Sequence, residues 1–336
     1  MSEPPDVPPR RAPLRPAGRG VKTSRPLAVL ALLFVGAGIL MVGATRIRDA
    51  RDAGIPVRGS TGHPAPECDV LAEGIPLPED VRESSGLAIG GRDPGVFWTH
   101  NDAGNDPELF AIDASGTLLQ RVRVAGADLI DWEDIESAPC GEETCLYVAD
   151  IGDNDADRER ITVYRVIEPP ATASETVPAD AFHARFPDGP RDAESLFTDG
   201  SGVLYLVTKG RRETIDLYRW PALAEPGETG TLEHVRELFP EPEDNDDWVT
   251  AATSTPDRRW VGVRSYRSVY LYPMAALLSG RAVEPHTIDL SEHADAQGES
   301  LAMAEDGRMW VSSEGEGDEA STLSLLRCAL PDTSAP

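Results

Sequence analysis

The sequence predicts an all-β, five-bladed β-propeller that follows a single amino-terminal membrane helix. Three observations carry this prediction. A β-rich pattern occurs five times, the fifth copy lacks its last strand, and a matching strand lies before the first copy. Short runs of apolar and β-branched residues dominate residues 66–330, with almost no 3.6-residue period. A six-bladed ring with one degenerate unit is the alternative.

The segments that precede the repeats differ from them in composition. Residues 1–26 are rich in Pro and Arg, which is typical of a disordered tail. Residues 27–45 contain no charged residue, and at about 1.5 Å per residue they reach roughly 28 Å, enough to cross a hydrocarbon core. Basic residues before this run predict a cytoplasmic amino terminus. The part of the chain that follows the run, which we call the body, is then exported. Residues 46–65 form a stalk, and residues 331–336 form a short tail.

The location of the body follows from this segment. A retained helix over residues 27–45 gives a single-pass protein of the bacterial cell membrane with its carboxyl-terminal domain outside the cytoplasm. A signal peptide cleaved after Ala44 would give a secreted protein instead. A buried core helix is a third possibility, and it would leave the topology open.

Charge limits the function. The chain has 58 acidic and 31 basic residues, a net charge of −27. Residues 1–50 hold eight basic and three acidic residues, which leaves 23 basic and 55 acidic residues for the body. Such a body repels a phosphate backbone, so the composition argues against general nucleic-acid binding. An acidic surface of this kind can bind cations, or it can serve only to keep the protein soluble.

Four cysteines agree with export to an oxidising compartment. Cys140 and Cys145 flank a turn between two strand-like runs, so they can pair locally. Cys68 and Cys328 lie at the two ends of the folded part. A bond between them requires the ends of the body to be adjacent, and the absence of CxxC weakens a zinc or redox interpretation.

Each repeat starts with a similar motif and continues with further strand-like runs, three in the first four repeats and two in the fifth. The motifs are Glu83–Leu87, Asp131–Ile135, Asp192–Leu196, Trp248–Ala252 and Gly298–Leu301. The second runs are 96–102, 146–153, 204–210, 260–266 and 309–315, and the third runs are 109–113, 161–166, 216–220, 269–273 and 323–327. Fourth runs at 118–124, 181–186, 232–238 and 283–290 complete four units. Four strands per unit are typical of propeller blades.

The fifth unit has no fourth run of its own. The strand around Cys68–Leu71 can complete it and thereby remove the open edge of the ring. A Cys68–Cys328 bond would then join neighbouring strands of the last blade. The cysteine positions and the repeat count therefore predict the same closure.

The shared motifs predict a metal site on the axis, because the innermost strands of all blades begin at one face. Aligned motifs place Ser85, Glu133, Glu194, Thr250 and Glu299 in a ring at the top of the channel. Three carboxylates close together favour a bound cation. An all-oxygen ring suits Ca²⁺ better than Zn²⁺. The alternative is that these acids are separately solvated or bind backbone amides of the next blade.

The loops on the same face contribute further ligand candidates. An acidic half from the first two blades faces a basic half from the third and fourth, and basic residues there could bind an anionic ligand. Surface pairing between the loops is the alternative. The candidates are His100, Asn101, Asp102, Asp131, Asp134, Asp150, Asp153, Asn154, Asp192, Lys209, Arg211, Arg264 and Glu314.

Several of these motifs resemble an uncharacterised family of bacterial exported β-propeller proteins. The matching stretches include Trp98–Gly104, Asp131–Ile135, Val148–Asn154 and Asp192–Leu196. More distantly, the blade count and the Ser/Glu/Glu/Thr/Glu series are similar to the calcium-activated nucleotidases, or apyrases. This resemblance implies a central Ca²⁺ held by Ser85, Glu133, Glu194, Thr250 and Glu299, and it implies no nucleotide hydrolysis, because the nucleotide-contacting residues cannot be placed.

Three functions are compatible with these features. The favoured hypothesis is a membrane-anchored, extracytoplasmic propeller with axial calcium that binds a ligand or an envelope protein at its loop face. A calcium-dependent hydrolase of a phosphorylated or other anionic substrate is the second, with Lys209, Arg211 or Arg264 neutralising charge. A structural scaffold in the envelope is the third. The binding hypothesis is favoured because the sequence identifies no nucleophile or general base.

Overall fold

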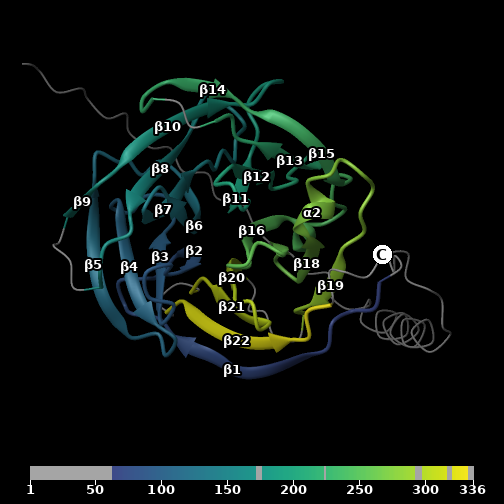
Figure 1. Cartoon of the computed structure of the whole chain (residues 1–336), viewed down its shortest axis with the longest axis horizontal. Helices are drawn as coiled ribbons and strands as arrows, with labels where there is room; N and C mark the ends of the chain where they lie inside the picture. Colours follow the sequence, from purple (N-terminus) through teal and green to yellow (C-terminus); the bar gives the residue numbers. More distant parts are fainter. Residues whose placement is uncertain (1–62, 172–175, 223–224, 292–296, 316–319, 332–336) are drawn as a thin grey trace, which may run out of the picture. The chain divides into compact units, whose positions relative to one another are not determined.

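Five antiparallel sheets surround a central axis (Figure 1). This computed structural model describes residues 63–171, 176–222, 225–291, 297–315 and 320–331. The predicted tail, the predicted membrane helix and most of the predicted stalk lie outside the described residues. Within the described part of the chain, no helix is long and apolar enough to cross a membrane.

The first two blades each contain four main strands and one added outer strand. Blade one consists of β2 (Ser84–Ile89), β3 (Val96–Asn101), β4 (Glu108–Asp113) and β5 (Leu118–Ala125), with β9 (Thr176–Pro178) outside β5. Blade two consists of β6 (Trp132–Cys140), β7 (Glu143–Asp150), β8 (Ile161–Ile167) and β10 (Asp180–Arg185), with β14 (Thr229–Thr231) outside β10.

The other three blades have four strands each. Blade three contains β11 (Ala193–Thr198), β12 (Leu204–Thr208), β13 (Ile215–Arg219) and β15 (Glu233–Phe239). Blade four contains β16 (Val249–Ser254), β17 (Trp260–Ser265), β18 (Ser268–Pro273) and β19 (His286–Asp289). Blade five contains β20 (Gly298–Met303), β21 (Arg308–Ser313), β22 (Thr322–Cys328) and β1 (Cys68–Pro76). The turns η1 (Asn245–Asp247) and α2 (Met274–Leu277) are the helical elements of the described chain.

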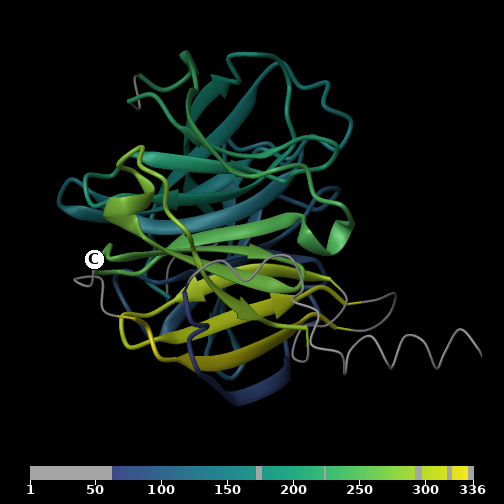
Figure 2. The same ribbon diagram turned by 90° about the vertical axis from the view of Figure 1, so that its right-hand side faces the viewer.

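The ring closes as predicted, and the five-blade prediction is confirmed. Strand β1, drawn in blue, pairs antiparallel with β22, drawn in yellow (Figures 1 and 2). Cys68 lies opposite Cys328 in this register, and the two are joined by a disulfide. Cys140 and Cys145 form the second predicted disulfide. Two disulfides are consistent with an oxidising, extracytoplasmic compartment.

Connections between the third and fourth strands reach back to the preceding blade. Strand β9 leaves blade two and pairs in parallel with β5 of blade one. Strand β14 leaves blade three in the same way and pairs in parallel with β10 of blade two. Each pairing covers an otherwise open sheet edge, which limits unwanted strand pairing.

Apolar side chains fill the spaces between neighbouring blades. Trp98 and Trp132, for example, are fully buried in the cluster between blades one and two. Equivalent clusters lie at the other four interfaces. Each fully buried large apolar side chain contributes about 1.5–3 kcal/mol, so the stacking of blades stabilises the ring.

The channel itself is polar, and the carboxylate of Asp134 reaches across it. Asp134 of β6 is fully buried, and its Oδ2 accepts the backbone N–H groups of Leu196 at 2.8 Å and Ala252 at 3.1 Å. Its Oδ1 accepts the N–H of Ile135 at 2.8 Å. Leu196 belongs to blade three and Ala252 to blade four, so one side chain of blade two connects three inner strands.

We predict that Asp134→Ala lowers the free energy of unfolding by about 3 kcal/mol, because it leaves buried N–H groups without an acceptor. Asp134→Asn keeps one acceptor oxygen and should cost less. Asp106→Ala is the control, since this exposed aspartate pairs only weakly, with Arg123 at 3.7 Å. Denaturant unfolding measures all three variants, and equal stability of Asp134→Ala and the control would contradict the bridging role.

The two disulfides should differ in their contribution to stability. Cys68 and Cys328 are 260 positions apart, whereas Cys140 and Cys145 are five apart. In the chain-entropy model, the long loop contributes about 5 kcal/mol and the short loop about 2 kcal/mol. Replacing each pair with alanines and measuring unfolding tests this order. A larger loss for the Cys140/Cys145 pair would show that ring closure does not depend on the covalent link.

Candidate functional site

The five residues predicted to ring the axis all lie in the same kind of backbone irregularity. In every inner strand, the register to the second strand shifts at this residue. Glu133, for example, has no partner between the pairs Trp132–Asp150 and Asp134–Ala149. A bulge of this kind re-aims a side chain, and bulges are common beside functional sites. We call the end of the channel at which the inner strands begin the upper mouth.

Ser85 and Thr250 use their hydroxyl groups to join neighbouring blades. Ser85 Oγ donates to the backbone oxygen of Glu133 at 2.9 Å. Thr250 Oγ1 donates to the backbone oxygen of Gly298 at 2.8 Å. Both contacts reach the inner strand of the next blade. Each hydroxyl still has lone pairs that could bind a cation.

Glu194 has a cationic partner from its own blade. Lys209 Nζ lies 2.5 Å from Glu194 Oε1, and both side chains are at least nine-tenths buried. Burial raises the pKa of Glu194 to about 8, and the ammonium opposes this shift. Burial by itself would lower the pKa of Lys209, but the carboxylates of Glu194, Asp192 and Glu133 raise it overall. Lys209 is therefore a fixed positive charge inside the ring.

A cluster of three carboxylates lies beside this pair. Asp102, Asp131 and Glu133 each offer an oxygen, and these oxygens lie within 4.8 Å of one another. Burial raises the pKa of Asp131 to about 7, and the charges of Asp102 and Asp192 add to the shift. Burial also raises the pKa of Glu133 well above its usual range, with repulsion from Glu194 next in size. Glu133 is buried in this cluster and Asp102 and Asp131 are half-buried, so the three carboxylates disfavour one another's charged forms.

The loop after β7 holds this cluster in place. The N–H of Asp131 donates to Asp150 Oδ1 at 3.1 Å, and Arg158 pairs with the same oxygen at 2.8 Å. Asp153 accepts the N–H of Arg158 at 2.9 Å. This loop is therefore closed by its own aspartates and arginine, and it differs from a calcium-binding EF-hand loop.

Two buried oxygens near Asp131 have spare acceptor capacity. Asp150 Oδ2 and Asp192 Oδ2 accept no hydrogen bond from the described residues. Both side chains are almost fully buried, and their charges raise the pKa of Asp131. Buried carboxylate oxygens without donors are costly, so their presence here favours a cation in this region.

Glu299 lies on β20 of blade five, which neighbours blade one in the ring. Burial raises its pKa to about 7, and repulsion from Glu314 adds to this shift. Arg264 partly offsets it, although Arg264 is fully buried and donates to the backbone oxygens of Ser300 and Ser312. Arg264 is therefore part of the channel wall and not of the exposed loop face.

The remaining candidates divide between loop contacts and the interior. Arg211 donates to Asn154 Oδ1 and lies over Trp248, 5.5 Å from the ring centre. Asn101 Nδ2 donates to the backbone oxygen of Asp80 at 2.8 Å. His100 is fully buried, and burial lowers its pKa to about 4, so it stays neutral and does not reach the loop face. The sequence predicts His100 at the loop face, because the sequence does not show how deeply the end of this strand is buried.

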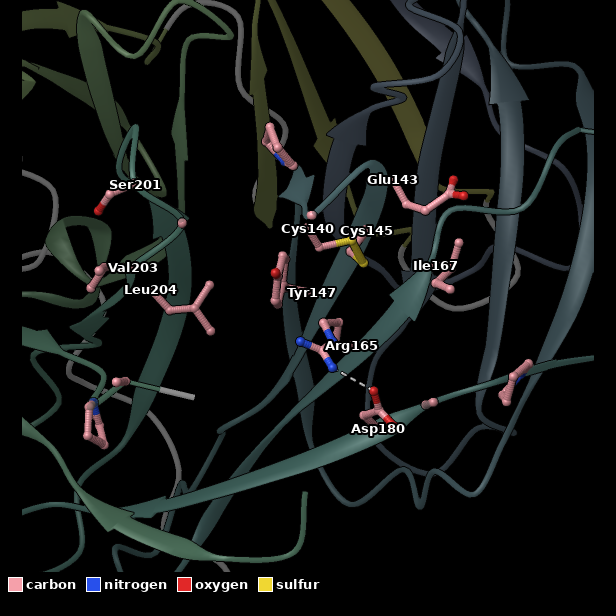
Figure 3. Close-up of a pocket in the computed structure, with 17 residues that line it drawn as sticks. Cys140, Glu143, Cys145, Tyr147, Arg165, Ile167, Asp180, Ser201, Val203 and Leu204 are labelled. Atoms are coloured by element: carbon pink, nitrogen blue, oxygen red, sulfur yellow. Dashed lines mark hydrogen bonds and ion pairs between the residues drawn. A yellow bond between two sulfur atoms is a disulfide. The ribbon is translucent and has the colours of Figure 1, made fainter. Parts of the chain in front are cut away.

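A hollow of about 710 Å³ lies between blades two and three (Figure 3), and its lining includes no residue of the three-carboxylate cluster. The Cys140–Cys145 disulfide, Tyr147 and Leu204 line it, and Arg165 pairs with Asp180 at 2.7 Å across its wall. Its lining mixes polar and apolar groups, and its described residues include no cluster of neighbouring carboxylates like the one at the upper mouth. We therefore place the candidate site at the upper mouth.

Several solved structures are similar to this chain at low sequence identity. No family model and no curated protein matches the chain. The PQQ-bound aldose sugar dehydrogenase of Streptomyces coelicolor has 11% identity and a TM-score of 0.48, with 80% of this chain and 100% of that chain covered. A gluconolactonase of Xanthomonas campestris has 14% identity and a TM-score of 0.40, over 81% and 99%. A streptogramin B lyase has 9% identity and a TM-score of 0.39, over 79% and 98%.

We predict that the Lys209–Glu194 pair stabilises the propeller only as a pair. Lys209→Met leaves Glu194 buried without its cation and should cost about 3–5 kcal/mol. The double variant Lys209→Met/Glu194→Gln should recover most of this loss. Unfolding in EDTA measures both variants without metal. A double variant as unstable as Lys209→Met would contradict direct compensation between the two charges.

Proposed function

We propose that the upper mouth binds Ca²⁺ through Asp102, Asp131 and Glu133. The approach of their three oxygens to within 4.8 Å carries the proposal. Carboxylates this close repel one another unless a cation or protons neutralise them. An all-oxygen set, with further oxygens at Asp150 and Asp192, suits Ca²⁺ better than a thiolate- or imidazole-binding metal. This places the cation beside the axial ring, because Lys209 already neutralises Glu194.

The backbone around the cluster supports the proposal. A Cβ atom on Gly152 would lie 1.9 Å from Glu133 Oε1 and 2.5 Å from Asp131 Oδ2. Gly152 thus leaves the space in which these two carboxylates approach each other. Any larger residue would displace one of them.

In this proposal the protein is a calcium-dependent binding module outside the cytoplasm, anchored through residues 27–45. Its partner is a ligand or an envelope protein that contacts the upper mouth. The net charge of −27 makes nucleic acid an unsuitable partner. A scaffold role in the envelope would need no metal, so a response to calcium separates the two.

The hydrolase alternative receives less support from the basic residues. Lys209 pairs with Glu194, Arg211 with Asn154, and Arg264 with backbone oxygens. Lys209 would have to leave Glu194 before it could neutralise a substrate, and Arg264 is fully buried. Arg211 keeps its charge beside the neutral Asn154 and is the one of the three that could still do so. Calcium-dependent release of phosphate from nucleotides or sugar phosphates, lowered by Arg211→Ala, would favour the hydrolase over the binding module.

We predict that Ca²⁺ raises the melting temperature of the wild-type protein relative to EDTA. A hundredfold excess over Kd corresponds to about 2.7 kcal/mol of stabilisation. Asp131→Asn removes one ligand and should weaken Ca²⁺ binding, as measured by calorimetric titration. Asp106→Asn removes an exposed carboxylate outside the cluster and should leave binding unchanged. Equal melting temperatures in EDTA and in saturating Ca²⁺ would contradict the proposed site.

Gly152→Ala tests the same site by steric exclusion. The added methyl group should weaken Ca²⁺ binding although no ligand is removed. Gly200→Ala is the matched control, since its Cβ would meet its nearest neighbour at 3.8 Å. Unchanged affinity in Gly152→Ala would place the cation elsewhere.

A further inference from the structure

A second hollow lies at the other end of the channel, where the inner strands finish. We call this end the lower mouth. The hollow has a volume of about 240 Å³, and its lining includes Glu136, Ser137, Thr144, Arg258, Pro94 and Met303. It is separate from the calcium site, because the buried side chain of Asp134 lies between Glu133 and Glu136 along β6.

The hydrogen-bonded side chain of Glu136 forms a polar wall of this hollow. Its side chain is 3% exposed, and Oε1 accepts from Arg258 Nη1 and Ser254 Oγ, both at 2.6 Å. Oε2 accepts from Thr253 Oγ1 at 3.1 Å, which leaves this oxygen with a lone pair for another donor. The charges of Glu136 and Arg258 cancel, so the wall is polar but neutral overall. Such a wall favours a neutral ligand over an ion.

The backbone at Arg258 is strained. The contact of the Arg258 side chain with Glu136 explains why an arginine and not a glycine stands at this position. Arg258 has a φ of 56°, a left-handed conformation that favours glycine. The same position in the turns of blades three and five is occupied by Gly202 and Gly307, with φ of 81° and 84°. All three residues donate their N–H to the carbonyl three positions earlier. Blade four thus has an arginine where a glycine would be relaxed, and strain of this kind is typical of ligand-binding sites.

Further groups extend the wall on the side of blade two. Arg258 Nη2 donates to the backbone oxygen of Ser137 at 3.1 Å. Ser137 Oγ is buried and has no hydrogen-bond partner among the residues that the structure describes. Ile89, Pro94 and Met303 add apolar surface to the same hollow.

We propose that the lower mouth binds a small neutral cyclic polyol, a monosaccharide or a cyclitol. Neighbouring hydroxyl groups of such a ligand can donate to Glu136 and accept from Arg258, and the C–H face can pack on the apolar residues. The volume of 240 Å³ lies below the range of about 300–1,000 Å³ typical of sites for drug-sized ligands. The hollow therefore suits one sugar ring and not an oligosaccharide.

Saturation-transfer NMR on the full-length chain with D-glucose, D-xylose, myo-inositol and glycerol tests this proposal. At least one cyclic polyol should bind saturably, with a Kd of about 1 mM given its few atoms. Ser137→Val fills the hollow without removing a contact of Glu136, and it should weaken binding at least tenfold. Ser201→Val is the control, because Ser201 lines the 710 Å³ hollow instead.

The outcomes separate this site from its rivals. Binding should persist in EDTA and in Asp131→Asn, because the calcium site lies at the opposite mouth. Loss of binding in Ser201→Val but not in Ser137→Val would move the ligand to the other hollow and overturn the proposal. Saturable binding by none of the three cyclic compounds would also overturn it, as would full affinity in a folded Ser137→Val protein.

Discussion

The structure depends on the way in which three buried carboxylates of one strand are neutralised. Glu133, Asp134 and Glu136 of β6 all lie at the channel, where an isolated charge would be strongly destabilising. Asp134 accepts backbone N–H groups from two other blades, and Glu136 accepts an arginine and several hydroxyls. Glu133 lies in the three-carboxylate cluster, for which we propose a bound cation.

This arrangement makes the ring asymmetric although its blades share one pattern. Blade two supplies the acids, whereas blades three and four supply the donors Leu196, Ala252 and Arg258. Blades five and one contribute no such carboxylate bridge in the described residues, and there β1 and the Cys68–Cys328 disulfide complete the ring. Polar contacts across the channel and covalent closure at the edge thus act on different parts of the same propeller.

The sequence predicts the fold far better than the site. Blade number and closure follow from local strand patterns and from Cys68 and Cys328, so repeat analysis finds them. Strands β9 and β14 are three residues long and belong to no repeat, so no periodic signal marks them. The motif alignment places Glu133 and Glu194 together, but it cannot show that Lys209 turns inward to Glu194 or that a bulge brings Glu133 near Asp102. Those contacts depend on side-chain direction and on elements distant in sequence.

A crystal structure with Ca²⁺, or with Tb³⁺ as an anomalous substitute, tests the central claim most directly. The account predicts one peak about 2.3–2.6 Å from carboxylate oxygens of Asp102, Asp131 and Glu133, with Lys209 still paired to Glu194. A peak on the axis among Glu133, Glu194 and Glu299, with Lys209 displaced, would contradict it. An upper mouth without any peak at saturating metal would contradict it as well.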